Sequence, residues 1–550
     1  MKTLAWQPWS AEAFQKAAEQ GKLVLLDISA VWCHWCHVMD ETTYSDPEVI
    51  KAIEAGFVPI RVDTDASPEI NERYNLGGWP TTAILSPEGR LLTGGTYIPP
   101  QSMLPFLRQV RNWWETEGSS LPPTPARRPM RQATSFAVKE LPEQALQTVL
   151  DAYDVQFGGF GKEAKFPFPM ALSLLFDTAL LYQSTEARDA LLQTLAAYAR
   201  GGMYDPVEGG FFRYSTDAAF RLPHYEKMAE DNGQLLSIYS HAALMEPQLA
   251  EIADDVLRYV HAAFWQEAEA GFSASQDADQ SYYALDASQR SRRVPPMIDR
   301  RLFTRPNAFL VSGILAHSAY RGDLAWQQRV EETLRRWTQR SFETPAGLAH
   351  QRNAPSQRGL LSDTVPLALA CLDAYVVGGN RTFLNDATRL GDWMIAQLWE
   401  ESEGAFRDQP LQREAIGALA EPVWPYEENG RAAQLLARLH LAVPQQGYAY
   451  YTDRLLEWGA MQVEEMGLFS AAFGIAAIER NEVWNEIDWV GDPPVSLGRL
   501  ALWPLTWIRR LNAEEAAVRG YAQPGGYLCR ADSCVGPLDV DALEQALQLS

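Results

Sequence analysis

Two cysteines stand three residues apart in "AVWCHWCHVMD" (residues 30–40), and a histidine follows each of them. They are Cys33 and Cys36, followed by His34 and His37. A C-x-x-C pair with a following histidine suits three kinds of chemistry: covalent haem attachment, half of a zinc site, or a dithiol that exchanges with disulfides. Which of these applies depends on the elements that position the pair.

The haem and zinc interpretations lack supporting residues. Haem attachment requires export, and the stretch "MKTLAWQPWSAEAF" (1–14) contains no apolar core of a secretory signal. A structural zinc ion needs four ligands, and no second C-x-x-C or H-x-H lies near the pair. Cys529 and Cys534 are spaced differently and lie far away in the sequence, so we expect two free thiols there. We therefore expect neither a metal nor another cofactor.

The dithiol interpretation accounts for the flanking sequence. The apolar run "KLVLLDIS" (22–29) predicts a buried strand that delivers Cys33 to the start of a helix. Unpaired N–H groups and the helix dipole favour a thiolate at that position and so lower the pKa of the cysteine. We expect Cys33 to be the nucleophile, His34 to reinforce it when protonated, and Cys36 to be the more buried resolving thiol.

Asp27 and Pro80 extend the same interpretation. Asp27 lies in the middle of the predicted strand, where a buried carboxylate needs a role or a partner. We expect it to accept a proton from Cys36, and the alternative is an aspartate at the edge of the sheet. Pro80 in "GGWPTT" precedes another predicted strand, and we expect a cis Trp79–Pro80 bond that sets the backbone against the cysteine pair. The alternative is an ordinary trans proline.

The elements around the cysteine pair predict a small α/β domain over residues 1–118. A helix with Ser10 as its N-cap, the strand at 22–29, a second strand at 57–63 and two strands within 81–95 alternate with helical segments. Residues 119–138 are rich in proline and serine and predict a linker.

Residues 139–550 read as amphipathic helices separated by a recurring glycine-plus-apolar element. The element occurs six times, as "GGFG", "GGFF", "AGFSA", "AGLAH", "GAFRD" and "GLFSA", each about two helices after the last. Six helix pairs that close on themselves form an (α/α)6 toroid, in which each pair needs its neighbours to bury its apolar face. An open solenoid is the competing prediction.

Several long motifs carry a family resemblance. "VLLDISAVWCHWC" with "GGWPTT" resembles the thioredoxin superfamily over residues 1–118. "CHWCHVMDETTYSDPEV", "GGFGKEAKFP", "SASQDAD" and "YLCRADSCVGP" resemble the thioredoxin-domain-containing family that includes spermatogenesis-associated protein twenty. This resemblance covers nearly the whole chain and implies a thioredoxin-like domain fused to a six-hairpin, glycosidase-like toroid. After "DAD" the chain departs from the family pattern, with "QSYYALDASQRSRRVPPMIDRR" in place of an acidic and aromatic insertion.

Polar residues cluster in the toroid at residues 201–236. Acidic, basic and aromatic groups together suit a sugar pocket, in which rings stack and carboxylates act as acid and base. Eighteen tryptophans fit an aromatic-lined cavity. The alternative is that most of the tryptophans are buried core and that the charged residues form structural ion pairs. The candidates are Asp205, Arg213, His224, Glu226, Lys227, Asp231, Asp277, Asp279 and Asp363.

Composition limits the partners. The 550 residues carry a net charge of −23, which disfavours nucleic acids and anionic membranes. We expect no membrane span, since no run of about 18 apolar residues occurs. Five cysteines do not make a disulfide framework, so we expect a reducing cytoplasm.

The leading hypothesis is an intracellular thiol-disulfide oxidoreductase that uses Cys33 and Cys36, joined to a toroid that binds a sugar-like ligand or a protein partner. The first alternative is a carbohydrate-active enzyme of epimerase or glycosidase type with its chemistry in the toroid. The second is a non-enzymatic interaction scaffold. The sequence does not identify the ligand, the redox partner, the direction of electron flow or the oligomeric state.

Overall fold

The computed structural model describes residues 4–117, 138–341, 344–352, 354, 357–411, 415–531 and 533–548. The chain divides into two compact units. The first comprises Met1–Arg131 together with two short later segments, Asp277–Asp279 and Pro410–Val423, and the second contains the rest of the chain. The predicted linker at 119–138 falls almost wholly outside the described residues.

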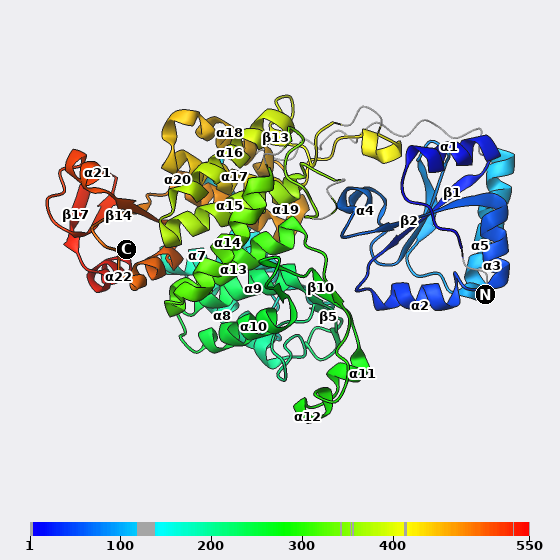
Figure 1. Ribbon diagram of the computed structural model, residues 1–550, viewed down its shortest axis with the longest axis horizontal. Coiled ribbons are helices and arrows are strands. Elements are labelled where there is room, and N and C mark those ends of the chain that lie inside the picture. The colour runs from blue at the N-terminus through cyan, green and yellow to red at the C-terminus, as the bar shows by residue number, and fades with distance from the viewer. Residues whose placement is uncertain are drawn as a thin grey trace. The chain divides into compact units, whose positions relative to one another are not determined.

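The first unit is built on a four-stranded sheet in the order β2-β1-β3-β4 (Figure 1). β1 runs parallel to β2 and antiparallel to β3, which pairs antiparallel with β4. The elements are α1 (Ala11–Gln20), β1 (Leu23–Ser29), α2 (His34–Thr42), α3 (Pro47–Gly56), β2 (Phe57–Asp63), α4 (Pro68–Tyr74), β3 (Thr81–Leu85), β4 (Leu91–Gly95) and α5 (Pro100–Glu117). This order and pairing confirm the predicted thioredoxin-like fold, and Ser10 caps α1 as predicted.

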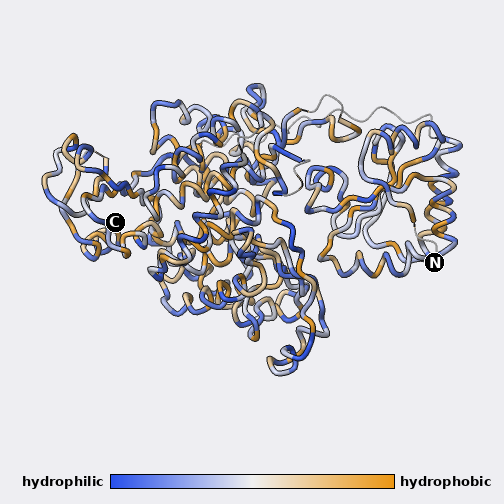
Figure 2. Tube along the Cα trace, viewed as in Figure 1, coloured by the Kyte–Doolittle hydropathy of each residue, from blue (hydrophilic) through white to orange (hydrophobic). Residues whose placement is uncertain are grey.

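Both faces of β1 are covered, which explains why this strand is a continuous apolar run rather than an alternating one (Figure 2). Leu23 and Leu25 of β1 pack with residues of α3 and α5 on one face. Val24, Leu26 and Ile28 pack with residues of α1 and α4 on the other. Asp27 therefore lies in a strand that is buried on both sides.

The second unit contains a closed ring of helix pairs. Six inner helices contact one another in succession, and the last contacts the first. They are α7 (Pro169–Leu181), α9 (Ala229–Ala242), α13 (Thr304–Arg321), α15 (Leu361–Gly378), α17 (Tyr426–Ala442) and α20 (Ala471–Asn481). Closure confirms the (α/α)6 toroid and rules out the open solenoid.

Each inner helix packs against one outer helix. The outer helices are α8 (Thr185–Arg200) on α7, α10 (Leu249–Ala263) on α9, α14 (Leu324–Ser341) on α13, α16 (Arg381–Leu398) on α15, α18 (Tyr448–Ala460) on α17 and α6 (Leu141–Ala152) on α20. The first helix of the ring thus pairs with the last. Inner helices are buried around most of their circumference. Among the described helices, α15 alone is long and apolar enough to cross a membrane, and 83% of its 18 residues are buried inside the protein.

The recurring glycine-plus-apolar element is the turn that precedes an inner helix. In three repeats the fourth residue of the helix, an asparagine, accepts a hydrogen bond from the phenylalanine N–H of the element and donates one to the carbonyl of that phenylalanine. The asparagines are Asn232, Asn307 and Asn429, which bind Phe211, Phe272 and Phe406. Each repeat thereby fixes its turn against the start of its inner helix.

Short elements connect the helix pairs. They are β5 (Tyr214–Ser215) with β6 (Pro223–His224), β7 (Lys227–Met228) with β10 (Ser275–Gln276) and β11 (Ile298–Asp299), β8 (Trp265–Gln266) with β9 (Gly271–Phe272), β12 (Trp399–Glu400) with β13 (Ala405–Phe406), and the helical turns α11 (Gln280–Tyr283), α12 (Ala287–Arg290) and α19 (Val463–Met466).

The ring ends at Asn481, and a second α/β layer follows it (red in Figure 1). Its sheet has the order β15-β14-β16-β17. The elements are β14 (Asn485–Val490), a 3-10 segment η6 (Val495–Leu502), β15 (Thr506–Leu511), α21 (Ala513–Val518), β16 (Gly525–Arg530), β17 (Ser533–Leu538) and α22 (Val540–Gln548). The prediction that residues 139–550 are entirely toroid is therefore corrected, because this segment adds a four-stranded sheet.

Candidate functional site

The cysteine pair lies where β1 meets α2. Cys33 is the N-cap of α2, and its Sγ accepts a hydrogen bond from the N–H of Cys36 at 3.1 Å. The two residues are joined as a disulfide with their Cα atoms 5.2 Å apart. Both are buried, at 4% and 3% exposure, so Cys36 is not clearly the more buried of the two. The helix start that we predicted for Cys33 is confirmed.

Aromatic side chains surround the pair. Trp35, between the cysteines, is 46% exposed, and its ring centroid lies 5.2 Å from that of Tyr97. Trp32 contacts Trp79, which precedes Pro80 through a cis peptide bond, as predicted. Such a surface, apolar and partly exposed beside a sulfur pair, suits contact with a polypeptide.

Asp27 is 1% exposed and is not at the edge of the sheet. Its Oδ2 accepts a hydrogen bond from Arg61 Nε at 2.6 Å, and Tyr44 donates to its Oδ1 at 3.4 Å. Burial raises the pKa of Asp27 to about 6, while the guanidinium of Arg61 opposes that shift. The ion pair with Arg61, which is shared with Asp40, supplies the partner that a buried carboxylate needs. The role of Asp27 as a proton acceptor for Cys36 stays a prediction.

The two histidines of the motif differ in surroundings. The His34 ring is exposed and lies 5.7 Å from Trp35. His37 Nδ1 lies 3.6 Å from Asp277 Oδ2, within the first unit. The prediction that Asp277 and Asp279 reach the toroid cavity is wrong, because both belong to the compact unit of the cysteine pair and neither lines the central cavity of the ring.

Asp205 and Lys227 form a buried ion pair. Lys227 Nζ donates to Asp205 Oδ2 at 2.8 Å and to the Gly209 carbonyl at 2.8 Å, and Arg290 Nη1 donates to the same carboxylate oxygen at 2.7 Å. The ammonium also lies 4.1 Å from the ring centroid of Tyr259. Burial lowers the pKa of Lys227 to about 8. With the side chains of Asp205 and Lys227 fully buried, the pair suits the structural role that we kept open.

His224 and Glu226 form a second group. His224 Nδ1 lies 3.3 Å from Glu226 Oε1, and its ring stacks on Tyr214 with centroids 4.5 Å apart. Tyr214 stacks in turn on Phe166, which is 39% exposed. Arg213 donates its backbone N–H to the carbonyl of Glu226. This group combines a histidine, a carboxylate and stacked rings, and its role in a sugar pocket stays a prediction.

Asp231 and Asp363 lie in the first turns of the inner helices α9 and α15. Burial next to Glu230 raises the pKa of Asp231 to about 7. Asp363 accepts hydrogen bonds from the backbone N–H of Arg305 at 3.2 Å, and its other oxygen lies 2.8 Å from His350 Nδ1. The guanidinium of Arg305 bridges Glu230 and Glu428, each at 2.8 Å. Charged groups from four inner helices therefore meet at these first turns.

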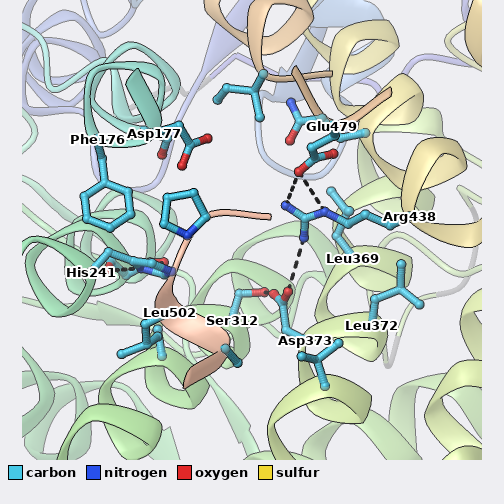
Figure 3. Close-up of a pocket in the computed structure, with 18 of the residues that line it drawn as sticks. Phe176, Asp177, His241, Ser312, Leu369, Leu372, Asp373, Arg438, Glu479 and Leu502 are labelled. Carbon is cyan, nitrogen blue, oxygen red and sulfur yellow. Dashed lines mark hydrogen bonds and ion pairs between the residues drawn. The ribbon is translucent and has the colours of Figure 1, made fainter. Parts of the chain in front are cut away.

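The central cavity of the ring lies farther along the inner helices and contains none of the predicted residues. All six inner helices line it, together with residues 501–507 of the C-terminal layer, and its volume is about 250 Å³. Figure 3 shows Arg438 between two carboxylates of this cavity. Its Nη2 donates to Glu479 at 2.6 Å, and its Nη1 lies 3.5 Å from Asp373, which accepts from Ser312 at 2.7 Å.

Asp177 faces the same cavity beside Glu479 (Figure 3). Burial and the charge of Glu479 raise the pKa of Asp177 to about 8, and burial also raises the pKa of Glu479. Asp177 is therefore largely protonated near neutral pH and can donate a hydrogen bond. The signal for these residues was present in the sequence: Asp177, Asp373 and Arg438 each stand within an otherwise apolar helical stretch. An ionisable group on the apolar face of a helix must meet a partner or a cavity.

Among the described residues, no group of three or more histidine, cysteine, aspartate or glutamate side chains is arranged to hold a metal ion. The described residues include a second disulfide, Cys529–Cys534, which corrects the prediction of two free thiols. Cys371 is a buried free cysteine.

Comparison with known proteins supports the predicted resemblance. A family model described as "Protein of unknown function, DUF255" (Thioredox_DsbH) matches residues 1–127. Human spermatogenesis-associated protein 20 is 33% identical over 305 residues, which cover 50% of this chain and 39% of the human protein. The matched region thus spans about two fifths of the length of that relative.

Two further similarities are confined to single parts of the chain. The thiol:disulfide interchange protein DsbD 2 of Pseudomonas aeruginosa is 34% identical over 86 residues, which cover 14% of this chain and 15% of that protein. A solved D-mannose isomerase is 10% identical, with a TM-score of 0.48, over 60% of this chain and 87% of the isomerase. The toroid itself is established by the helix packing described above.

Proposed function

We propose that the first unit is a thiol-disulfide oxidoreductase with Cys33 as nucleophile and Cys36 as resolving thiol. One observation carries the proposal: Cys33 caps the N-terminus of α2, and its sulfur accepts the N–H of Cys36 at 3.1 Å. That hydrogen bond and the helix dipole stabilise a thiolate more than a thiol. The name of the Pseudomonas relative, a thiol:disulfide interchange protein, agrees with this chemistry.

The proposed exchange conserves atoms and electrons. The Cys33 thiolate attacks one sulfur of a partner disulfide, forms a mixed disulfide and releases the other partner sulfur as a thiolate, which takes a proton from solvent. Cys36 then loses its proton and attacks Cys33 Sγ, which releases the second partner sulfur. The protein ends as the Cys33–Cys36 disulfide, and the partner as two thiols. The reverse sequence oxidises a partner dithiol.

The partner is a polypeptide in this proposal, in a cytoplasmic setting. Trp35, whose ring contacts the part-buried Tyr97, places exposed aromatic surface beside the cysteine pair. A small thiol such as glutathione needs no such surface, whereas a peptide gains apolar contact there. No nucleic-acid or membrane partner is proposed, because the chain carries a net charge of −23.

The test is a redox titration of the full chain by thiol trapping in a glutathione series. We expect a reversible two-electron transition of the Cys33–Cys36 pair between about −270 and −120 mV, the range of working dithiol catalysts. Cys36→Ser should accumulate a mixed disulfide on Cys33, and Cys371→Ala is the matched control because that cysteine is buried and free. A pair that never closes, or that closes irreversibly, would rule the proposal out.

A second candidate function is binding of a sugar-like ligand in the toroid. The supporting observation is the central cavity of about 250 Å³, in which Arg438, Asp373 and Glu479 supply donors and acceptors beside a carboxyl, Asp177, whose pKa is raised to about 8. That volume lies below the range of about 300–1,000 Å³ typical of drug-sized ligands, so a single sugar ring suits it better than a chain. A protonated and an ionised carboxyl side by side also suit the epimerase or glycosidase alternative.

Thermal unfolding in a panel of neutral hexoses tests the binding. A hexose that binds the folded state raises Tm in proportion to the logarithm of its concentration. Asp177→Asn should weaken that rise, whereas Asp189→Asn, on the exposed side of outer helix α8, should not. A chain whose Tm is unaffected by every hexose would leave the toroid as a protein-binding scaffold.

A further inference from the structure

The C-terminal sheet has the same connectivity as the sheet of the first unit. β14, η6, β15, α21, β16, β17 and α22 follow one another as β1, α2 with α3, β2, α4, β3, β4 and α5 do. In both sheets the first strand is parallel to the second and antiparallel to the third, which pairs antiparallel with the fourth. The chain therefore contains two thioredoxin-like sheets. The segment "GDPPV" (491–495), which follows β14 as "AVWCHWC" follows β1, has no cysteine.

The cysteines of the second sheet lie on a different pair of strands. Cys529 of β16 and Cys534 of β17 are direct cross-strand neighbours, joined as a disulfide with Cα atoms 4.0 Å apart. Cys529 is 7% exposed, whereas Cys534 is exposed to solvent. One accessible and one buried sulfur suits dithiol exchange, because the accessible sulfur can meet the partner and the buried one can resolve the intermediate.

Tyr521 connects this sulfur pair to a buried carboxylate. Its hydroxyl lies 3.3 Å from Cys529 Sγ and donates a hydrogen bond to Asp488 Oδ2 at 3.1 Å. Asp488 is completely buried in β14, and Arg509 and Arg519 donate to its two oxygens at 2.7 and 3.0 Å. The hydroxyl can thus accept the proton of a Cys529 thiol while it donates its own toward Asp488. Stacking on Tyr527, with centroids 3.9 Å apart, holds the ring in place.

We propose that Cys529 and Cys534 form a second thiol-disulfide exchange site, built on a second thioredoxin-like sheet and open to small thiols and disulfides. In the oxidising direction the Cys534 thiolate attacks an external disulfide such as oxidised glutathione and releases one thiolate, which takes a proton from solvent. Cys529 loses its proton through Tyr521 and attacks Cys534 Sγ, which releases the second external thiol. Two protein thiols become one disulfide, and one external disulfide becomes two thiols.

A purely structural disulfide explains these observations less well. β16 and β17 are already joined by backbone pairs on both sides of the cysteines, at Leu528 with Val535 and at Arg530 with Ser533. A crosslink between residues only five apart closes a short loop. Such a crosslink stabilises the folded state least, because closing a short loop removes the least conformational entropy from the unfolded chain. It also leaves unexplained why a tyrosine hydroxyl joins the sulfurs to a buried carboxylate.

The test uses the full chain with Cys33→Ser and Cys36→Ser, so its outcome does not depend on the proposed function of the first pair. The chain is equilibrated in glutathione buffers and then alkylated. Mass spectrometry measures the alkylated fraction of the peptide that contains Cys529 and Cys534. We expect the disulfide to open and close reversibly while circular dichroism shows a folded chain. A disulfide that opens only when the chain unfolds would establish a structural crosslink and overturn the proposal, and so would two thiols that never close.

Single variants in the same background test the assignment of the two sulfurs. Cys529→Ser should form a mixed disulfide with oxidised glutathione about tenfold faster than Cys534→Ser, because Cys534 is the exposed sulfur. Tyr521→Phe should slow closure of the pair and change its pH dependence, whereas Tyr527→Phe, whose hydroxyl donates to the Gln523 carbonyl, is the matched control. Equal rates for the two cysteine variants would overturn the assignment, and equal pH profiles for the two tyrosine variants would remove Tyr521 from the exchange.

Discussion

The two sheets of this protein share a connectivity but place their sulfur atoms differently. In the first, the cysteines follow the first strand and cap a helix, whereas in the second they bridge the third and fourth strands. The contacts of the sulfurs differ accordingly: a backbone N–H donates to the proposed nucleophile in one case, and a tyrosine hydroxyl lies beside the proposed resolving sulfur in the other. The strand connectivity is the same in both sheets, and the proposed chemistry depends on which elements of the sheet carry the cysteines.

A buried aspartate paired with an arginine occurs in both sheets. Asp27 of β1 pairs with Arg61 of β2, and Asp488 of β14 pairs with Arg509 of β15; in each case the two residues are register partners. Asp27 shares its face of the first sheet with Leu23 and Leu25, and Asp488 lies on the face of the second sheet opposite to Ile487. The second sheet has this ion pair but no C-x-x-C. Such a pair can therefore stabilise a sheet without cysteine chemistry beside it, and this weakens the prediction that Asp27 accepts a proton from Cys36.

The largest expected effect separates the two sulfur pairs. Cys33→Ser should lower the reduction of a peptide disulfide by at least about a thousandfold, because the nucleophile is lost. Cys534→Ser should lower it by less than about tenfold if the second pair serves small thiols. Initial rates with the full chain measure both. Similar losses in the two variants would mean that both pairs act on one substrate in series.

The two ion pairs should differ in how much their loss destabilises the sheets. Arg61→Met leaves Asp27 with a long bond to Tyr44 and should destabilise the first sheet by about 3 kcal/mol or more, since it strands a buried charge. Arg509→Met leaves Asp488 with Arg519 and Tyr521 and should cost the second sheet roughly half as much. Native-state hydrogen exchange at β1 and β14 reports each opening free energy. A larger loss at β14 would contradict the comparison.

The pH dependence of the first sheet should reveal Asp27. Burial raises its pKa in the folded state from the ordinary value of 3.8 to about 6, so the folded state keeps the proton to a higher pH than the unfolded state does. Between about pH 4 and 6 the folded state therefore binds more protons, and stability falls as pH rises, by at most about 3 kcal/mol in total, then stays level. Hydrogen exchange of β1 measures the slope. In Asp27→Asn the slope should disappear, and an unchanged slope would assign it to another group.

The smallest effect concerns the exposed aromatic side chain beside the first pair, Trp35. Trp35→Ala should raise KM for a peptide disulfide by about threefold to tenfold, because roughly 1 kcal/mol of apolar contact is lost. The rate with oxidised glutathione should change much less. Equal changes with both substrates would indicate that Trp35 positions the cysteines rather than the partner.

Local patterns in the sequence predicted the features that depend on neighbouring residues. The helix start at Cys33, the cis bond before Pro80, the Ser10 cap and the closed ring all follow from short motifs or from their repetition. The glycine elements marked the turns that Asn232 and its counterparts fix, although the asparagines themselves were not noticed.

The features that were missed depend on contacts between distant residues. Asp177, Asp373 and Arg438 come from three helices and meet only when the ring closes. Asp277 looked like part of the toroid because of its place in the chain, yet it lies beside His37. The helical repeat predicts that the toroid continues to the C-terminal residues, and the pairing of β14 with β16, which makes this segment a sheet, is not visible in either strand alone.

The pairing of α6 with α20 sets the order of events during synthesis. The ring cannot close until Ala471–Asn481 has left the ribosome, more than 300 residues after Leu141–Ala152. At about 5–20 residues per second, α6 then waits on the order of 20–60 seconds for its partner. Most of the first unit is complete before the ring begins. The nascent toroid is thus a chain of unclosed hairpins with exposed apolar faces for most of its translation. During this interval chaperones can bind the largest apolar surface.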